Sequence, residues 1–202
     1  MPEALKKLIH NLNFLPGIGE KAATKLAFFL LNSNQNYLNE LEKSIINIKN
    51  NTSFCKECYS ITDKTKSKCN ICNDDSRNKN EIMVVEEYLD MLTIEQAGGY
   101  LGLYHILGGA ISPINGVFVG DLKFQELFDR IRKADKKLEI ILATNPNIEG
   151  EATCSYFVEE IKKIGLKHKV KITRLSRGLS SGYIEYADNI TLVNSLKERK
   201  EI

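Results

Sequence analysis

The sequence predicts a multidomain α+β protein: an N-terminal helical region, a short cysteine-rich segment, an α/β domain with a mainly parallel sheet, and a C-terminal helical segment. Three observations predict this class. Apolar residues recur at helical spacing near the N-terminus, two Cys-x-x-Cys pairs follow, and short apolar runs then alternate with amphipathic stretches. We place the four parts at residues 1–53, 54–80, 81–175 and 176–202.

The composition is that of a folded protein rather than a disordered one. Of the 202 residues, 43% are apolar and 27% are charged. No run approaches the roughly 20 apolar residues that cross a bilayer, and the N-terminus has no apolar signal core, so we expect a cytoplasmic protein without a membrane partner. Residues 1–80 hold 12 Lys and Arg against 8 Asp and Glu, which favours a polyanionic partner only weakly.

Helical spacing of apolar residues predicts three helices in the N-terminal region. The members are Leu5, Leu8, Ile9 and Leu12 in the first helix, Ala23, Leu26, Ala27 and Leu30 in the second, and Leu38, Leu41, Ile45 and Ile48 in the third, which runs from Tyr37 to Ile48. Asn-rich stretches flank the third helix and predict where it begins and ends.

A Gly-rich hairpin, Gly17-Ile18-Gly19, connects the first two helices. Without Cβ atoms at the glycines, backbone N–H groups could approach a phosphate closely. The following helix adds the partial positive charge of its first turn, and Lys21 and Lys25 lie one turn apart on it. A Pro-Gly turn alone is weak evidence, but the Lys-Ala-Ala that follows makes the stretch resemble the helix-hairpin-helix motif. We therefore predict sequence-independent DNA contacts from Gly17, Ile18, Gly19, Lys21 and Lys25.

Four of the five cysteines form two pairs, Cys55-x-x-Cys58 and Cys69-x-x-Cys72. Thiols stay reduced in the cytosol, which argues against disulfides, and four thiolates are the number that one structural zinc ion takes. Residues 54–80 hold too few apolar side chains for a core of their own, so we predict one structural Zn²⁺ per chain that folds this segment. An iron–sulfur cluster is the main rival, and redox-active or simply buried cysteines are the weaker one.

Beyond residue 80, apolar runs and amphipathic stretches alternate in a βαβαβαβ order that is typical of a parallel sheet. The predicted strands are Ile82–Val85, Leu101–Leu107, Leu138–Ala143 and Val170–Leu175. The predicted helices are Tyr88–Ala97, Phe124–Lys136, Glu151–Ile164 and, at the C-terminus, Thr191–Arg199.

Acidic and amide residues follow two of these strands: Glu86 after the first, and Asn145, Glu149 and Glu151 after the third. Ligands of open parallel sheets bind at this edge. The arrangement resembles a Toprim domain, whose enzymes pair a strand-end glutamate with a magnesium-binding DxDxxG sequence. Asn145 and Asn147 stand where the two aspartates would be, which removes charge that a hard cation needs. We expect a partner-binding edge here, although each glutamate alone also fits a solvated helix start.

Taken in order, these motifs resemble the RecR family over essentially the whole chain. Finer stretches support the resemblance: LGGAISP at 107–113, ATNPNIEGEAT at 143–153 and RGLSSGYIEYAD at 177–188. The last is similar to a family segment likened to a Walker B element, but Ser180 and Ser181 depart from the family pattern there. The resemblance implies a non-catalytic recombination mediator: a homodimeric or homotetrameric ring that clamps DNA and works with RecO and RecF to load recombinase at gaps in DNA repair.

Two other function classes stay open at this point. A magnesium-dependent Toprim nuclease or topoisomerase-like enzyme would use Glu86, Glu149 and Glu151, and the asparagine pair argues against it. A zinc-dependent adaptor without DNA affinity would make the hairpin a plain turn. The basic stretch 162–177 fits a DNA-facing surface and a solvated face equally well.

Overall fold

The structure is a computed structural model that describes residues 1–176 and 183–202. These residues form two compact units, 1–51 and 52–202, so the cysteine-rich segment belongs to the same unit as the α/β sheet. Within the described ranges, no helix is both long enough and apolar enough to cross a membrane.

The N-terminal unit consists of three helices: α1 (Glu3–Asn13), α2 (Glu20–Leu31) and α3 (Gln35–Asn51). Helices α1 and α2 pack together, and Ala23 and Ala27 of α2 are completely buried. The third helix begins two residues before the predicted start, because the Asn34 side chain accepts a hydrogen bond from the Tyr37 N–H at 2.9 Å and so caps the first turn.

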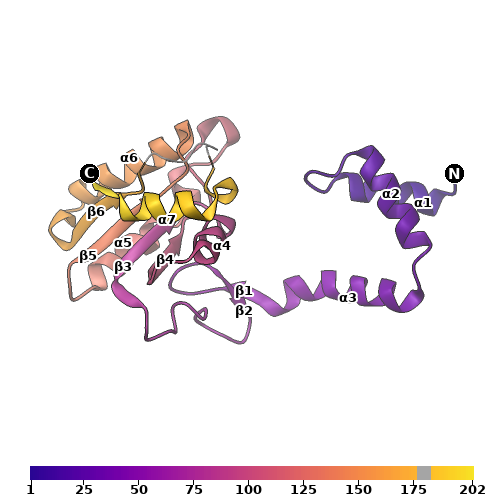
Figure 1. The fold of residues 1–202 in the computed structure, drawn as a ribbon, viewed down its shortest axis with the longest axis horizontal. Coiled ribbons are helices and arrows are strands. Elements are labelled where there is room, and N and C mark those ends of the chain that lie inside the picture. Colours follow the sequence, from indigo (N-terminus) through magenta and orange to yellow (C-terminus); the bar gives the residue numbers. More distant parts are fainter. Residues whose placement is uncertain (177–182) are drawn as a thin grey trace. The chain divides into compact units, whose positions relative to one another are not determined.

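The second unit is built on a five-stranded sheet, drawn from magenta through orange to yellow in Figure 1. In spatial order the strands are β4 (Gly102–Ile106), β3 (Asn78–Val85), β5 (Leu138–Ala143), β6 (Val170–Arg174) and β7 (Lys200–Glu201). The first four are parallel and β7 is antiparallel to β6. The mainly parallel sheet is confirmed, whereas β7 was not predicted.

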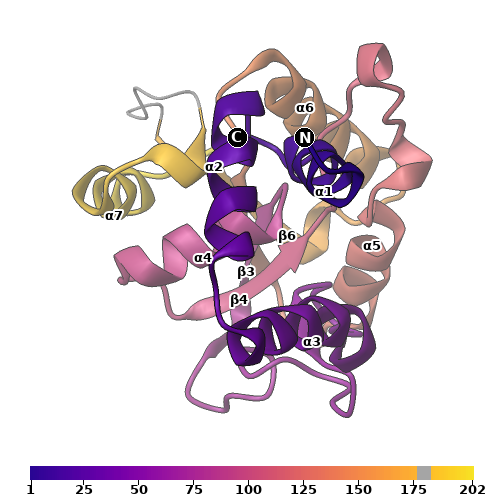
Figure 2. The ribbon, with the colours of Figure 1, turned by 90° about the vertical axis from the view of Figure 1, so that its right-hand side faces the viewer.

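Helices cover both faces of this sheet (Figure 2). Side chains of α5 (Phe124–Lys133) and α6 (Ile148–Lys163) pack with Ile140 on one face. Side chains of α4 (Tyr88–Ala97) and α7 (Asn189–Lys197) pack with Ile141 on the other. Because successive strand residues point to opposite faces, the unbroken apolar run of β5 serves both layers.

Side-chain caps place the starts of two helices earlier than predicted. Asn147 accepts a hydrogen bond from the Gly150 N–H at 2.8 Å, so α6 begins at Ile148 and not at Glu151. Asp188 accepts from the Thr191 N–H at 2.9 Å, and α7 accordingly begins at Asn189. The described residues of this unit also form four short 3₁₀ turns: η1 (Pro113–Asn115), η2 (Val119–Asp121), η3 (Lys167–Lys169) and η4 (Ile184–Tyr186).

The cysteine-rich segment contains a small hairpin and is tied to the sheet at its end. Strands β1 (Thr52–Phe54) and β2 (Ile61–Asp63) are antiparallel. Arg77 donates from both terminal nitrogens to the Glu95 carboxylate of α4, at 2.9 and 2.6 Å, and the Tyr104 hydroxyl donates to the same carboxylate at 2.7 Å. This charge-assisted pair fixes the chain where it enters β3.

Candidate functional site

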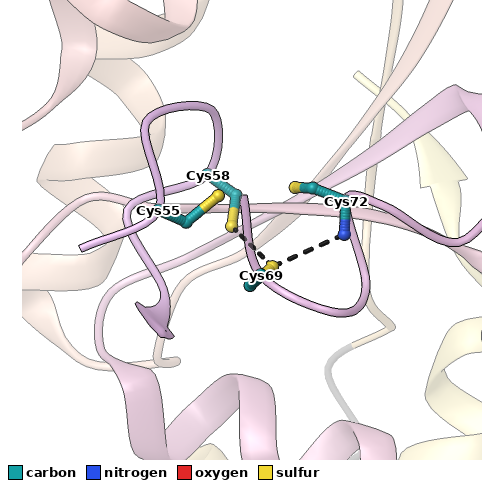
Figure 3. Close-up of side chains that lie close together, drawn as sticks. All are labelled: Cys55, Cys58, Cys69 and Cys72. Carbon is teal, nitrogen blue, oxygen red and sulfur yellow. Dashed lines mark hydrogen bonds between the residues drawn. The ribbon is translucent and has the colours of Figure 1, made fainter. Parts of the chain in front are cut away.

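The four paired cysteines converge on one point, as Figure 3 shows. All four are buried, and their sulfur atoms lie within 4.8 Å of one another, with Cys58 Sγ and Cys69 Sγ 3.5 Å apart. A tetrahedral zinc ion with bonds of about 2.3 Å needs ligand sulfurs about 3.8 Å apart. Among the described residues no other group of three or more His, Cys, Asp or Glu side chains is close enough to hold a metal ion.

The chemistry of this cluster fits a cation. Hydrogen bonds that the Cys58 thiol donates to Cys69 and Cys72, together with burial, raise the pKa of Cys58 far above its ordinary value. Four buried thiols therefore do not ionise together unless a positive ion compensates their charge. With four cysteines and no other ligand in the cluster, a bound ion would have no open position for water or substrate, which is the arrangement of a structural site.

The cluster is joined to the edge strand of the sheet. The carbonyl oxygen of Cys58 accepts a hydrogen bond from the Ile106 N–H of β4 at 2.8 Å. The ring of the next residue, Tyr59, meets His105 edge to face with centroids 5.7 Å apart. The fully buried His105 bonds through Nε2 to the Lys123 carbonyl at 2.7 Å. Metal binding is thereby linked structurally to the outermost strand.

The predicted hairpin is an open turn between α1 and α2. Gly17 has φ of +77°, a conformation that side chains rarely adopt, and the Ile18 N–H donates to the Leu15 carbonyl at 3.0 Å. An added Cβ at Gly17 or Gly19 would meet nothing within 4 Å, so the turn is accessible. Gly19 precedes the first residue of α2, and Lys21 is exposed. Lys25, one turn further along, is exposed as well.

At the sheet edge, Glu86 and Asn145 meet directly. Glu86 is 5% exposed and follows β3, and Asn145 is 5% exposed and follows the neighbouring β5. The Asn145 backbone N–H donates to Glu86 Oε1 at 2.8 Å, and its Nδ2 donates to Glu86 Oε2 at 2.6 Å. Burial raises the pKa of Glu86, and the two hydrogen bonds oppose that rise.

The two other predicted acids lie in the first turn of α6. Both Glu149 and Glu151 are half-buried. Glu151 forms an ion pair with Arg174 of β6 at 2.6 Å, and the hydrogen bond to Glu151 raises the pKa of that guanidinium. Glu149 is near enough to Glu86 for its charge to raise the pKa of Glu86. Among the described residues, the three acids do not gather into one group that could share a metal ion.

Comparison with known proteins finds a family match in each of the two units of the chain. Residues 5–49 match the family described as RecR, helix-hairpin-helix, and residues 80–176 match the Toprim domain family. Recombination protein RecR of Herpetosiphon aurantiacus is 43% identical over 202 residues, which span 100% of this chain and 96% of that protein. The chain belongs to the RecR family. The predicted helix-hairpin-helix, four-cysteine cluster and Toprim domain are thereby confirmed.

The Toprim edge of this RecR-family chain does not fit the magnesium ion that Toprim enzymes bind. Both oxygens of Glu86 already accept N–H donors from Asn145, in a buried position. Asn147, at the second aspartate position, caps α6 through its side-chain oxygen. Neither amide carries the negative charge that a hard cation requires.

The sequence analysis did not single out several residues near this edge. Asp90 is 3% exposed and accepts a hydrogen bond from the Glu87 N–H at 2.9 Å, as part of a capping box. The Glu-x-x-Asp spacing of this capping box is the sequence signal that could have identified Asp90. Thr153 accepts from the Ile111 N–H at 2.8 Å, which only the folded arrangement reveals. Of the Walker-B-like stretch, residues 177–182 lie outside the described residues.

Proposed function

We propose that this RecR-family protein is a DNA-binding recombination mediator of the bacterial cytoplasm that makes and breaks no bond. It acts as a clamp on DNA and works with RecO and RecF to promote recombinase loading at gaps. The observation that carries the proposal is the accessible hairpin of residues 17–19, followed on α2 by two exposed cations, Lys21 and Lys25.

The hairpin supports DNA binding through contacts that do not depend on base sequence. Backbone N–H groups at the start of α2 and its partial positive charge favour a phosphate. Lys21 and Lys25 add two full charges one turn apart, on the side chains that most often neutralise the DNA backbone. The resulting contact slides along DNA, as a clamp requires, since it reads no base edge.

The four-cysteine cluster supports one structural Zn²⁺ per chain, held by Cys55, Cys58, Cys69 and Cys72. Zinc favours a closed set of four thiolates, and this segment has few apolar side chains with which to fold otherwise. The ion fixes the loop that carries Tyr59 and so supports the edge strand β4.

The Toprim edge supports partner binding through its exposed rim rather than its buried centre. Glu86 and Asn145 hold the edge together from inside, whereas Glu149 and Glu151 are reachable from solvent. Acidic groups of this kind steer a basic partner surface, and we assign the docking of RecO or RecF to them. We also propose closure into a ring of two or four copies, for which the support is membership of the RecR family.

DNA binding is tested by the charge-reversed double variant Lys21→Glu with Lys25→Glu. Fluorescence anisotropy with a labelled duplex gives the affinity at several salt concentrations. We expect the variant to bind at least tenfold more weakly at about 0.1 M salt. Its log–log salt slope should fall by about two, because each lysine lost removes about one released counterion.

The matched control carries the same change of charge on another helix of the same unit: Lys43→Glu with Lys49→Glu, both exposed on α3. It should keep most of the affinity and of the salt slope. Equal losses in the two double variants would mean that net charge, and not the hairpin, governs binding.

Partner docking is tested with Glu149→Lys, and Glu159→Lys on the exposed side of the same helix is the control. We expect the first variant to lose RecO or RecF binding by at least about tenfold in surface plasmon resonance, since a repulsive charge replaces an attractive one. Retained binding to both partners in Glu149→Lys would contradict this role of the edge.

A further inference from the structure

Asn145 joins three separate segments of the Toprim edge. It follows β5, and its backbone N–H and its Nδ2 both donate to the Glu86 carboxylate that follows β3. Its side-chain oxygen Oδ1 accepts a hydrogen bond from the Ile184 N–H of η4 at 2.8 Å. Ile184 is fully buried among the residues that pack on the α4 and α7 face. One amide side chain thus connects the sheet edge with the C-terminal segment.

An amide suits this position, whereas a carboxylate does not. The group at the end of the Asn145 side chain must donate toward Glu86 and accept from Ile184, which a carboxylate cannot do. A carboxylate in its place would face the Glu86 carboxyl group across the 2.6 Å that now separate Nδ2 and Oε2. In a buried site such a pair is strongly repulsive unless a proton or a cation lies between the two groups.

The packing around this contact is tight. A Cβ added at Gly150 of α6 would overlap the Asn145 carbonyl oxygen and lie 2.8 Å from Glu86 Oε1. The first turn of α6 therefore presses directly against the contact. The backbone N–H groups of Gly108 and Gly109 both donate to the backbone carbonyl oxygen of Glu86 at 2.9 Å. These two hydrogen bonds hold the Glu86 backbone in place on another side of the contact.

We propose that Asn145 is a positioning residue whose side-chain amide takes the place of a divalent cation at this edge and fastens the η4 segment to the sheet. The amide N–H satisfies the Glu86 carboxylate, and the amide oxygen holds Ile184. The same amide thus satisfies Glu86 without a cation and attaches the C-terminal segment. This inference goes beyond DNA binding, and stability measurements test it without DNA.

Three variants of the full-length protein test this role. Asn145→Asp places a carboxylate against Glu86 but still offers an acceptor to Ile184. The double variant Glu86→Gln with Asn145→Asp reverses the polarity of the contact, so the new amide at position 86 donates to the new carboxylate at position 145. Asn147→Asp is the matched control, because an aspartate caps α6 as well as an asparagine does.

Thermal unfolding is followed in EDTA and in millimolar Mg²⁺ or Mn²⁺, and amide exchange at Ile184 is followed by NMR. In EDTA, Asn145→Asp should lower the unfolding midpoint by about 5 °C or more and speed exchange at Ile184 at least tenfold. The divalent cation should recover most of both losses in this variant. It should leave the wild type and Asn147→Asp unchanged, since only Asn145→Asp gains a carboxylate beside Glu86.

The double variant separates a positioning role from simple damage to the edge. It should regain most of the stability and of the protection at Ile184 in EDTA, and it should not respond to the cation. An Asn145→Asp variant that fails to fold, beside a double variant that folds, would support the proposal. Three outcomes would overturn it: Asn145→Asp equal to wild type in EDTA, no recovery in the double variant, or an equal cation response in wild type.

Discussion

At the scale of single residues, Asp90 is a carboxyl group placed where ionisation is costly. It is 3% exposed, and Oδ2 accepts the Glu87 N–H at the start of α4. Burial and the neighbouring charges of Glu86, Glu87 and Glu185 raise the pKa of Asp90 to about 7. The folded protein therefore binds this proton more tightly than the unfolded chain does. Stability from this group is present at low pH and is lost as pH rises from about 4 to about 7.

The substitution Asp90→Asn should remove this pH dependence, because the amide oxygen can still accept the Glu87 N–H. Above pH 7 we expect the variant to be more stable than wild type, by at most about 4 kcal/mol for a shift of about three pKa units. At pH 4 the two proteins should differ little. Urea unfolding at both pH values gives the comparison, and a constant difference across this range would rule out a protonated Asp90.

The role of a residue could be predicted where the spacing of residue types along the chain defines the site, and could not where the site depends on a distant contact. The two Cys-x-x-Cys pairs determined the metal cluster from sequence. That Asn145 contacts Ile184, 39 positions away, depends on how β5 and η4 meet in the folded unit, and no local pattern encodes it.

At the scale of elements, the cysteine-rich segment is a support for the edge of the sheet. An unpaired edge strand exposes backbone donors and acceptors. One such donor, the Ile106 N–H of β4, is satisfied here by a hydrogen bond to the Cys58 carbonyl oxygen. The Arg77 and Glu95 ion pair fixes the other end of the segment against α4. The folded segment thus protects strand β4.

Removing the metal with a chelator should expose this edge selectively. We expect the Ile106 amide to exchange about tenfold faster or more, because its acceptor is lost when the segment opens. The neighbouring Leu107 N–H, which donates to the Val85 carbonyl within the sheet at 3.0 Å, should change far less and serves as the internal control. NMR-detected hydrogen exchange measures both. Unchanged Ile106 protection in metal-free protein would contradict the coupling.

Elements with a continuous apolar signal were predicted more closely than the strands of two or three residues. Helix α4 and strand β5 have the predicted bounds, since each carries a continuous apolar signal. Helix α5 ends at Lys133 and not at Lys136, because Ala134 is already extended. Strands β1, β2 and β7 have two or three residues each; β1 pairs with β2, and β7 pairs with β6. Such strands leave no period to detect.

At the scale of the whole molecule, the chain combines a helix-hairpin-helix unit, to which we assign DNA binding, with a Toprim unit, to which we assign partner binding. Within residues 1–51, only Ala23 and Ala27 are buried, and large apolar side chains such as Phe28 and Phe29 are exposed. A unit of this size with so small a core gains stability from association. This observation supports the proposed homo-oligomer, whose number of subunits depends on interface geometry that a single chain's sequence does not encode.

The most direct test of the account uses the zinc-loaded, full-length protein with end-labelled gapped duplex DNA in the presence of Mg²⁺. Native gels resolve the bound complex, and denaturing gels resolve strand lengths. A binding mediator with an amide-closed Toprim edge should shift the DNA and leave every strand intact. Cleavage that depends on Mg²⁺ would contradict the non-catalytic role, and the absence of any shift would contradict DNA binding by the hairpin of residues 17–19.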